Sequence, residues 1–351
     1  MTHKKIAIAA RSFVKGGGME RYVLDITSAM GALGIVPVLY TAKIDSSLPE
    51  ARLVQPIVFD TRLVPGKLKA RYLSFRIRPL HQRDPARILI GCFRNSCSDM
   101  AICGGTHIGF LRNTLKRPSL FDTLETRLER EFYGHSRLVI AHSRFMEHEL
   151  KTDYQVPQTK IRVLYPPVSP QFGRGSGDKA EARRALGLPN NEILFLFAST
   201  SHKRKGFDLL QKFFSQTRLP IRLLVAGRPT GGSDSKITYL GYRADMGNVY
   251  RAADFTIHPS LYEPFGLVCV ESLVCGTPII VSDRVGASET VADAAKVVMD
   301  TLDYDGLTSA IGQALDRRES LADAARSTPL SYNTDMVFHV QEMMRLYDSL
   351  D

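Results

Sequence analysis

Short apolar runs alternate with longer amphipathic segments along most of the chain. A short apolar run bounded by turn residues predicts a buried strand, and apolar residues at helical spacing predict a helix. The predicted strands are residues 5–10, 36–41, 88–92, 101–103, 138–141, 160–164, 193–197, 221–226, 238–241, 255–258 and 278–282. The predicted helices are residues 19–33, 120–135, 144–152, 181–186, 207 onward, 267–275, 306–315 and 336–350. This alternation is typical of α/β proteins, in which helices cover the faces of a sheet.

The pattern stops once and then restarts, which predicts two domains. The stop is a Pro/Gly-rich stretch, Tyr165-Pro-Pro167 followed by Gly173 and Gly175, which is typical of a linker. A chain of 351 residues is also long enough for two domains of ordinary size. We therefore expect one domain at residues 1–165 and a second that begins at residue 166.

Composition narrows the class of protein. Hydrophobic residues make up 44% of the chain and the charges are mixed, which indicates a soluble globular protein. No apolar run approaches the roughly 18–20 residues of a membrane span. The N-terminal residues MTHKKIAIAA become strand-like almost at once, so we expect no signal peptide.

The cysteines favour a reducing compartment. Their number is odd, no pair has C-x-x-C spacing, and we expect reduced thiols in a cytosolic protein. An alternative is a metal site built from the first three cysteines together with His107. The cysteines are Cys92, Cys97, Cys103, Cys269 and Cys275.

Positive charge is concentrated in the first half of the chain. Residues 1–172 hold 26 Lys and Arg against 14 Asp and Glu, a net charge of +12, and the remainder holds 20 against 22, a net charge of −2. Such a basic half suits nucleic acid, anionic lipid or a phosphorylated substrate. Residues 62–87 mix cations with apolar residues, which predicts an amphipathic segment on an anionic membrane surface, with a solvated helix face as the alternative. The cations are Arg62, Lys67, Lys69, Arg71, Arg76, Arg78, Arg83 and Arg87.

Residues 253–290 carry the strongest functional pattern in the chain. A strand at 255–258 is followed by a loop that ends at Gly266, and an apolar helix at 267–275 comes next. Gly276 stands where a helix needs a left-handed stop. Free amide groups at the start of such a helix attract an anion such as phosphate, and Gly266 lets a ligand approach the backbone closely.

Charged residues around this helix start suit a nucleotide-sugar. Glu263 before the helix and Glu271 one turn into it can each accept hydrogen bonds from a diol. A nucleotide-sugar has its diphosphate between a ribose and a sugar. With the diphosphate at the helix start, one diol would lie near Glu263 and another near Glu271. Another strand-to-helix loop contains Arg204 and Lys205, whose planar fork and point charge suit a diphosphate.

These residues carry a resemblance to the retaining family 4 glycosyltransferases. Glu263-Pro-Phe-Gly266 with Glu271 resembles the family's E-x7-E signature, and Arg204-Lys205 resembles the end of its G-x-x-x-x-R-K-G motif. The loop Gly286-Ala-Ser-Glu-Thr-Val291 resembles the family's Gly-Gly-x-x-Glu loop, with alanine in place of the second glycine. The resemblance covers nearly the whole chain, is most specific over residues 195–291, and extends to transferases of the lipopolysaccharide core.

The resemblance implies the GT-B fold, in which two Rossmann-like α/β domains face each other across a cleft. It implies that the acceptor binds to the domain at residues 1–165 and the nucleotide-sugar to the domain at residues 166–335. The final helix, within residues 336–351, would pack back on the first domain.

The resemblance also implies roles for individual residues. Arg204 and Lys205 would stabilise the departing diphosphate, Glu263 would hold sugar hydroxyls and Glu271 the ribose. His107, which follows a predicted strand and a Gly-Gly turn, would face the donor sugar, although a structural histidine is the alternative. The glycine-rich loop at 16–18 would let the donor phosphate and the acceptor approach the backbone, with a flexible turn as the alternative. The remaining donor contacts would come from Gly17, Gly18, Arg228, Phe265, Gly266 and Leu267.

The expected reaction is retaining transfer of a hexose from a UDP-, GDP- or ADP-sugar to a hydroxyl of a glycan or glycolipid, as in lipopolysaccharide-core or cell-surface polysaccharide synthesis. The cationic pair would replace Mg²⁺, so we expect no metal and no cofactor. Asp303-Tyr-Asp305 has the D-x-D spelling of metal-dependent transferases but precedes a predicted helix, and we expect it to cap that helix.

The expected location is the cytoplasm, with peripheral attachment to the inner face of the cytoplasmic membrane and no nucleic-acid partner. Three alternatives remain for the function. They are a GT-B nucleotide-sugar epimerase, a phosphorylase, and a basic RNA-binding protein whose affinity would fall steeply with salt.

Overall fold

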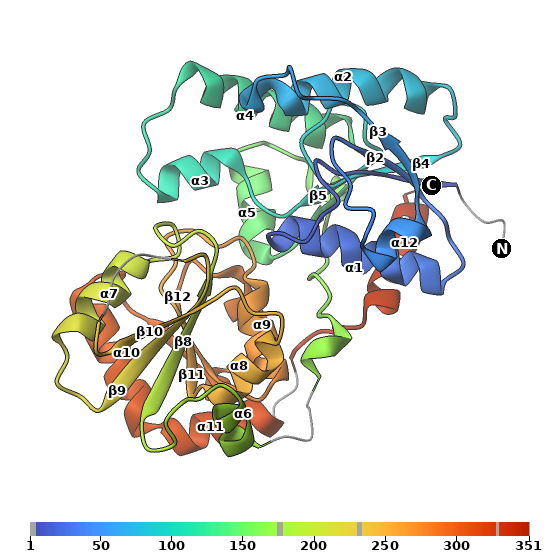
Figure 1. The fold of residues 1–351 in the computed structure, drawn as a ribbon. Helices are drawn as coiled ribbons and strands as arrows, with labels where there is room; N and C mark the ends of the chain where they lie inside the picture. The colour runs from blue at the N-terminus through green and yellow to red at the C-terminus, as the bar shows by residue number, and fades with distance from the viewer. Residues whose placement is uncertain (1–4, 174–177, 230–233, 328–329, 351) are drawn as a thin grey trace. The chain divides into compact units, whose positions relative to one another are not determined.

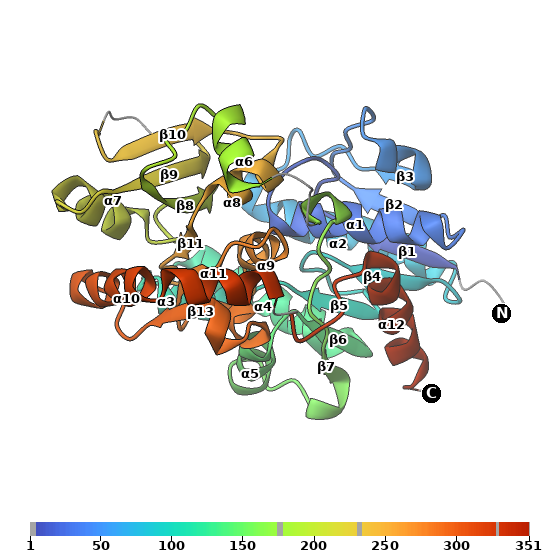
Figure 2. The same ribbon diagram turned by 90° about the horizontal axis from the view of Figure 1, so that it is seen from below.

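The computed structural model describes residues 5–173, 178–229, 234–327 and 330–350. The chain divides into two compact units, one formed by Met1–Pro167 with Asn333–Asp351 and the other by Val168–Tyr332. Each unit is a parallel β-sheet with helices on both faces (Figures 1 and 2). The predicted fold class, two Rossmann-like α/β domains, is confirmed.

In the first unit, the described strands form a seven-stranded sheet in the order β3-β2-β1-β4-β5-β6-β7. Helices α1 (Gly18–Ala32) and α12 (Met336–Asp348) cover one face, and α2 (Lys69–Gln82) and α4 (Leu120–His135) cover the other (Figure 1). Two further helices, α3 (His107–Asn113) and α5 (Arg144–Thr152), follow β5 and β6. The strands are β1 (Ile6–Ala9), β2 (Val38–Thr41), β3 (Gln55–Val58), β4 (Ile88–Gly91), β5 (Met100–Cys103), β6 (Leu138–Ala141) and β7 (Ile161–Val163).

The C-terminal helix α12 packs on α1 within this unit. Val340 and Met343 are fully buried in the same hydrophobic core as Ile26 of α1. The hydroxyl of Tyr22 lies 2.9 Å from Nε2 of His339, and this hydrogen bond also joins the two helices. Residues more than 300 positions apart in sequence thus share one core.

In the second unit, the described strands form a six-stranded parallel sheet in the order β10-β9-β8-β11-β12-β13. Aromatic side chains of β8 and α7 (Phe207–Gln216) pack together with α10 (Tyr304–Asp316) on one face. The helices α6 (Lys179–Ala185), α8 (Met246–Ala252) and α9 (Leu267–Val274) lie on the opposite face (Figure 1), and α11 (Arg318–Ser327) follows α10. The strands are β8 (Ile193–Ser199), β9 (Ile221–Gly227), β10 (Ile237–Gly241), β11 (Phe255–His258), β12 (Ile279–Ser282) and β13 (Lys296–Met299).

Two strands lie where the sequence predicts none. β3 is an edge strand whose four residues are all exposed, and it contains Pro56, which cannot donate to a sheet. β13 is an edge strand of the second unit. It has only four residues, which alternate between half-buried and buried. Each strand holds only a short apolar run, Ile57-Val58 in β3 and Val297-Val298-Met299 in β13, which the sequence analysis does not assign to a strand. No helix in the described part of the chain is both long and apolar enough to cross a membrane.

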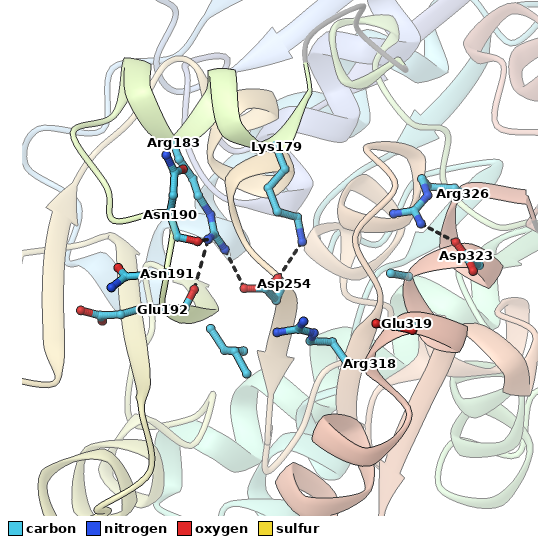
Figure 3. Close-up of a pocket in the computed structure, with 12 residues that line it drawn as sticks. Lys179, Arg183, Asn190, Asn191, Glu192, Asp254, Arg318, Glu319, Asp323 and Arg326 are labelled. Atoms are coloured by element: carbon cyan, nitrogen blue, oxygen red, sulfur yellow. Dashed lines mark hydrogen bonds and ion pairs between the residues drawn. The ribbon is translucent and has the colours of Figure 1, made fainter.

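A buried ion-pair network joins α6 to the amino-terminal edge of the second sheet. Asp254, which precedes β11, lies 2.6 Å from Nη2 of Arg183 and 2.7 Å from Nζ of Lys179 (Figure 3). Arg183 is only 4% exposed, and it also donates hydrogen bonds to the carbonyls of Ala252 and Asn190. These residues line a cavity of about 650 Å³ whose walls mix cations and anions, so it favours neither sign of ligand charge.

We predict that Asp254→Ala lowers the free energy of unfolding of the second unit by about 3–5 kcal/mol, because it leaves the buried Arg183 without its carboxylate. Urea unfolding followed by circular dichroism measures the change. Asp323→Ala, which removes the exposed partner of Arg326 on α11, is the matched control and should change stability little. Equal effects of the two substitutions would contradict the prediction.

Candidate active site

The site in the second unit is built where two neighbouring strands end. β8 and β11 are adjacent and parallel, so the loops at their carboxyl ends, residues 200–206 and 259–266, meet. The amide of Leu261 donates a hydrogen bond of 2.9 Å to the carbonyl of Arg204. Gly206 has φ +79°, and a Cβ there would lie 2.0 Å from the carbonyl oxygen of Pro259. Only glycine allows the two loops to approach this closely.

The close approach brings Glu263 between two cations. Its Oε2 lies 3.4 Å from Nη1 of Arg204 and 3.4 Å from Nζ of Lys205. Nη1 of Arg204 also donates to the carbonyl of Tyr262. Burial would raise the pKa of Glu263, but the charges of Lys205 and Arg204 outweigh it and hold that pKa below its ordinary value. The carboxylate therefore stays ionised at neutral pH.

The backbone around Glu263 is fixed by the loop that follows β12. The amide of Glu263 donates to the carbonyl of Arg284 at 3.0 Å, and the amide of Gly286 donates to the carbonyl of Glu263 at 3.0 Å. The amide of Ala287 donates to the carbonyl of Phe265 at 2.7 Å, and the Ala287 side chain is fully buried. Alanine in place of the second glycine is therefore accommodated in the core without disturbing this pairing.

Helix α9 begins beside the cation pair. Gly266 is its N-cap residue with φ +99°, Leu267 is its first residue, and its first turn contains no acidic side chain. The first amides of a helix have no acceptor within that helix and carry its positive end, which favours an anion. Phe265 has a different role, because its ring is buried and packs edge to face against Tyr332. Only its backbone could contact a ligand.

Glu271, in the second turn of α9, is held by a residue that the sequence analysis does not single out. The hydroxyl of Tyr250 on α8 donates a hydrogen bond of 2.7 Å to Oε2 of Glu271. Glu271 is half-buried, whereas Tyr250 is completely buried. The sequence analysis predicts no helix at α8, and the sequence alone gives no signal that Tyr250 would face Glu271.

Arg228, one of the expected donor contacts, directly follows β9. Gly227 ends β9 with φ +112°, and a Cβ there would lie 2.1 Å from the carbonyl of Ser199. That carbonyl accepts a 3.0 Å hydrogen bond from the amide of Arg228. The side chains of Arg228 and Tyr242 are both exposed, the latter by 69%. The structure thus fixes the backbone at this point rather than either side chain.

The expected glycine loop of the first unit lies at the start of α1. Gly17 is the N-cap residue and Gly18 the first residue of this helix. A Cβ at Gly16 would lie 3.1 Å from Cγ of Glu20, so the glycines let Glu20 fold back toward the loop, where its Oε1 accepts from the hydroxyl of Ser12 at 3.3 Å. A carboxylate in the first turn partly cancels the positive end of the helix, which disfavours phosphate and suits hydroxyl groups.

His107 begins helix α3 rather than ending a turn. Its Nε2 lies 3.0 Å from Oδ1 of Asp122 on α4, and its amide donates to Oε2 of the buried Glu129 at 2.8 Å. Hydrogen bonds from Ser119 and His107 hold the pKa of Asp122 well below its usual range, so this carboxylate is ionised. The histidine ring is thereby oriented by a permanent negative charge.

The alternative metal site is not formed. Among the described residues, no group of three or more His, Cys, Asp or Glu side chains could hold a metal ion. The five cysteines are free thiols, and burial raises the pKa of four of them to about 12 or above and that of Cys275 to about 11. Asp303 caps α10 by accepting a 2.8 Å hydrogen bond from the amide of Gly306, as predicted.

Comparisons with known proteins identify the family of this chain. The model of the family described as Glycosyltransferase Family 4 matches residues 16–172, and that of Glycosyl transferases group 1 matches residues 178–329. A "probable transglycosylase" of Burkholderia thailandensis is 37% identical over 97% of this chain and 96% of that protein. The chain belongs to the family 4 glycosyltransferases. A D-inositol 3-phosphate glycosyltransferase of Acidothermus cellulolyticus is 31% identical over 86% of this chain and 78% of that protein.

Solved structures share the GT-B fold of this glycosyltransferase. WaaG, a glycosyltransferase involved in lipopolysaccharide biosynthesis, superposes with a TM-score of 0.81 over 98% of this chain and 99% of its own, at 17% identity. HepE of Anabaena, in complex with UDP and glucose, gives a TM-score of 0.76 over 99% and 100% at 19% identity. These structures support the fold, and the predicted GT-B class is confirmed.

His258 is a further residue that the sequence analysis of this glycosyltransferase does not find. It ends β11, is fully buried, and its Nδ1 lies 2.5 Å from Oγ of Ser260. Burial, and after it the neighbouring charge of Lys205, lower the pKa of His258 to about 3. The imidazole is therefore neutral in the folded enzyme at any pH above about 3.

We predict that this histidine makes the enzyme less stable in mild acid. Below pH about 6.5, the ordinary pKa of histidine, the unfolded chain binds a proton at His258 and the folded chain does not. The free energy of unfolding is therefore highest above pH 6.5 and decreases as the pH falls toward 3. Between pH 7 and pH 5 the loss is about 2 kcal/mol for this residue. Urea unfolding of the wild type and His258→Gln at both pH values measures it.

Between pH 7 and pH 5, the free energy of unfolding of His258→Gln should fall by about 2 kcal/mol less than that of the wild type. The buried His142 and His339 of the first unit also have lowered pKa values, about 3 and about 4, and both remain in the variant as an internal background. An unchanged difference between pH 7 and pH 5 would show that His258 is not the titrating group.

Proposed function

We propose that the enzyme is a retaining glycosyltransferase that moves a hexose from a nucleotide diphosphate sugar to a hydroxyl of a glycan or glycolipid. The observation that carries this proposal is the grouping of Arg204, Lys205 and Glu263 beside the start of α9. Two cations and open helix amides suit a diphosphate, and the carboxylates beside them suit the diols of a sugar and a ribose.

Each residue of the grouping has a task in the transfer. Arg204 and Lys205 stabilise the negative charge that develops on the diphosphate as the bond to the sugar breaks. Glu263 holds both cations in place before the donor binds, and with the donor present it accepts hydrogen bonds from sugar hydroxyls. Glu271 accepts hydrogen bonds from the ribose hydroxyls. Leu267 offers its backbone amide to a phosphate oxygen.

The transfer proceeds on one face of the sugar. In the described residues, Glu263 is the carboxylate that borders the cation pair, and it is already bound to both cations, which makes it a poor nucleophile. We infer front-face transfer, in which the leaving phosphate takes the proton of the acceptor hydroxyl and the configuration at the sugar is retained. His107, oriented by Asp122, contacts the donor sugar or the acceptor.

The printed names of the relatives support a proposal for the chemical class of the substrates. The solved structure of HepE contains UDP and glucose, which favours UDP-glucose among the candidate donors, with GDP- and ADP-sugars as the other candidates. WaaG is named for lipopolysaccharide biosynthesis, and one relative is named for D-inositol 3-phosphate. A phosphorylated glycolipid or glycan is therefore the acceptor class that we propose, in agreement with the net charge of +12 on residues 1–172.

Two measurements test the proposed function. The first is thermal shift of the protein with UDP, GDP and ADP, followed by assays of hydrolysis and transfer with the matching sugars. The second is the same assay with EDTA, because a cationic pair that replaces Mg²⁺ should leave the rate unchanged. A transglycosylase, as one relative is named, would act on a glycan donor without binding a nucleotide.

We predict that Lys205→Ala lowers kcat about a hundredfold or more, as for the loss of one preorganised charge donor. Lys203→Ala, an exposed lysine in the same loop, is the matched control and should retain the wild-type rate. The melting temperature of each variant is measured alongside, so that unfolding is recognised. Near-normal turnover by Lys205→Ala would refute the assignment of the diphosphate site.

The basic segment of the first unit divides into a core face and an exposed face. On α2, Leu73 and Ile77 are completely buried, so these two apolar residues belong to the core. Leu63 and Phe75 are 99% and 76% exposed, and Arg62, Arg76 and Arg78 stand close to them in the sequence. The sequence alone does not separate the buried apolar residues from the exposed ones. A helix that carries apolar residues on its surface as well as on its core face shows no single apolar stripe.

The first turn of α4 extends this exposed face. Nζ of Lys67 lies 4.2 Å from the centre of the Phe121 ring, and Nη2 of Arg71 donates to the carbonyl of Leu124 at 3.1 Å. Leu120 is 86% exposed. We call this patch the basic–apolar surface, defined by Leu63, Lys67, Phe75, Arg76, Arg78, Leu120 and Phe121.

We infer that the basic–apolar surface attaches the enzyme to the inner face of the cytoplasmic membrane. Each cation near an anionic surface contributes about 1 kcal/mol, and each apolar side chain that enters the interface adds about 2 kcal/mol. Three of each would give about 9 kcal/mol, which suits reversible peripheral binding. The competing interpretation, a solvated helix face, does not account for the four large apolar side chains of this surface that are exposed beside the cations.

Sedimentation with vesicles checks this inference. The wild type should bind phosphatidylglycerol vesicles at low salt, dissociate at high salt and ignore phosphatidylcholine vesicles. Changing Lys67, Arg76 and Arg78 to Glu should abolish binding, whereas the same charge reversal at Lys212, Arg218 and Arg318 of the second unit should not. Absence of wild-type binding to anionic vesicles at low salt would remove the membrane proposal and leave the glycosyltransferase proposal intact.

A further inference from the structure

A buried tyrosine lies behind the carboxylate assigned to the ribose. Tyr250 is 0% exposed, and a phenylalanine would fill the same apolar space among α8, α9 and their neighbours. A buried hydroxyl costs free energy unless it is hydrogen-bonded. Here the hydroxyl donates to Oε2 of Glu271 at 2.7 Å. The contact with Glu271 is therefore what the hydroxyl of Tyr250 adds beyond the packing that a phenylalanine would provide.

The tyrosine is itself held firmly. Its carbonyl accepts a 2.7 Å hydrogen bond from the hydroxyl of Thr277, and the amide of Thr277 donates to the carbonyl of Ser272 on α9. The ring of Phe172 packs edge to face against the Tyr250 ring, with 6.0 Å between the ring centres. The backbone carbonyl of Phe172 accepts a hydrogen bond of 3.3 Å from Sγ of Cys275. Contacts from both sides therefore fix where the hydroxyl can point.

The chemistry of the donor also matters. Burial, and after it the charge of Glu271, raise the pKa of Tyr250 well above its ordinary value, so the hydroxyl stays protonated and always donates. A neutral donor orients the carboxylate without cancelling its charge, unlike the two cations that hold Glu263. A carboxylate has about four lone-pair sites, so one bond from Tyr250 does not exhaust its capacity to accept.

We propose that Tyr250 is a positioning residue that fixes Glu271 in the orientation required by the two ribose hydroxyls of the donor. The proposal rests on the assignment of Glu271 to the ribose in the proposed function. The Tyr250 hydroxyl sets the direction of the carboxylate before the donor arrives, so the donor does not have to order it on binding. The contact acts on donor binding and not on the charge that develops at the diphosphate.

The experiment compares nucleotides with and without ribose hydroxyls. Calorimetry measures the affinity of UDP and of 2′,3′-dideoxy-UDP for the wild type, Tyr250→Phe and Glu271→Gln, with the GDP or ADP pair used if one of those diphosphates binds the wild type more tightly. The control variant is Tyr304→Phe, which removes the hydroxyl of a half-buried tyrosine on α10 that packs on Phe213. Steady-state kinetics with the matching nucleotide-sugar provide KM and kcat.

We expect Tyr250→Phe to weaken binding of the ribonucleotide about fivefold to tenfold, as for the loss of one hydrogen bond of ordinary net strength, and Glu271→Gln to weaken it at least as much. Neither change should alter binding of the dideoxy form. The KM of Tyr250→Phe should rise while its kcat stays nearly unchanged. The control Tyr304→Phe should match the wild type in all of these measurements. The ratio of the two affinities is taken on one preparation, so it does not depend on the fraction of protein that is folded.

Each other result has a definite meaning. Wild-type affinity in Glu271→Gln, or no nucleotide binding by the wild type, would overturn the ribose assignment and the proposed donor site with it. Weak binding by Glu271→Gln together with wild-type binding by Tyr250→Phe would overturn only the positioning role. Equal loss of both nucleotides in Tyr250→Phe would show that the hydroxyl maintains the shape of the site in general, and would also overturn that role.

Discussion

The proposed donor site depends on one constraint, the close approach of the loops that follow β8 and β11. Gly206 makes this approach possible, because a Cβ there would lie 2.0 Å from the carbonyl of Pro259. Once the loops meet, Glu263 lies within 3.4 Å of both Arg204 and Lys205. An ion pair in partly buried surroundings is costly to break, since each unpaired charge would then be left poorly solvated. The chain's own contacts therefore hold both cations in the arrangement that the proposed diphosphate site requires.

Most of the fold could be predicted because its central strands are buried on both faces. Such strands are continuous apolar runs, for example Phe195 and Phe197 within β8, and the helices between them have clear apolar spacing. β3 was not predicted, because its apolar pair Ile57-Val58 directly follows Pro56, and proline argues against a strand. His107 was expected at the end of a turn, whereas Thr106 caps a helix that begins at His107 by accepting from the amide of Gly109 at 3.0 Å. A cap of this kind is visible in sequence only when a clear apolar spacing follows it.

The site could be predicted only in part, and the physical reason is that different residues leave different signals. Arg204, Lys205, Glu263 and Glu271 stand in loops or at helix starts, where a charged residue is conspicuous in the sequence. Tyr250 and His258 are buried aromatic residues within an α/β core, where such residues are ordinary. Their importance comes from the atoms that they face, Oε2 of Glu271 and the charge of Lys205, and those contacts exist only in the folded chain.

The distribution of charge separates the two tasks of the enzyme. The donor site uses two cations, both matched by Glu263, and lies in the part of the chain whose net charge is −2. Donor chemistry therefore explains none of the +12 carried by residues 1–172. Residues 62–87 hold 8 Lys and Arg against one acidic residue, Asp84, a net +7 of that excess, and this segment also exposes Leu63 and Phe75, a combination that solvation alone would not favour. A partner that is both anionic and apolar satisfies both features, and a glycolipid acceptor in an anionic membrane is such a partner.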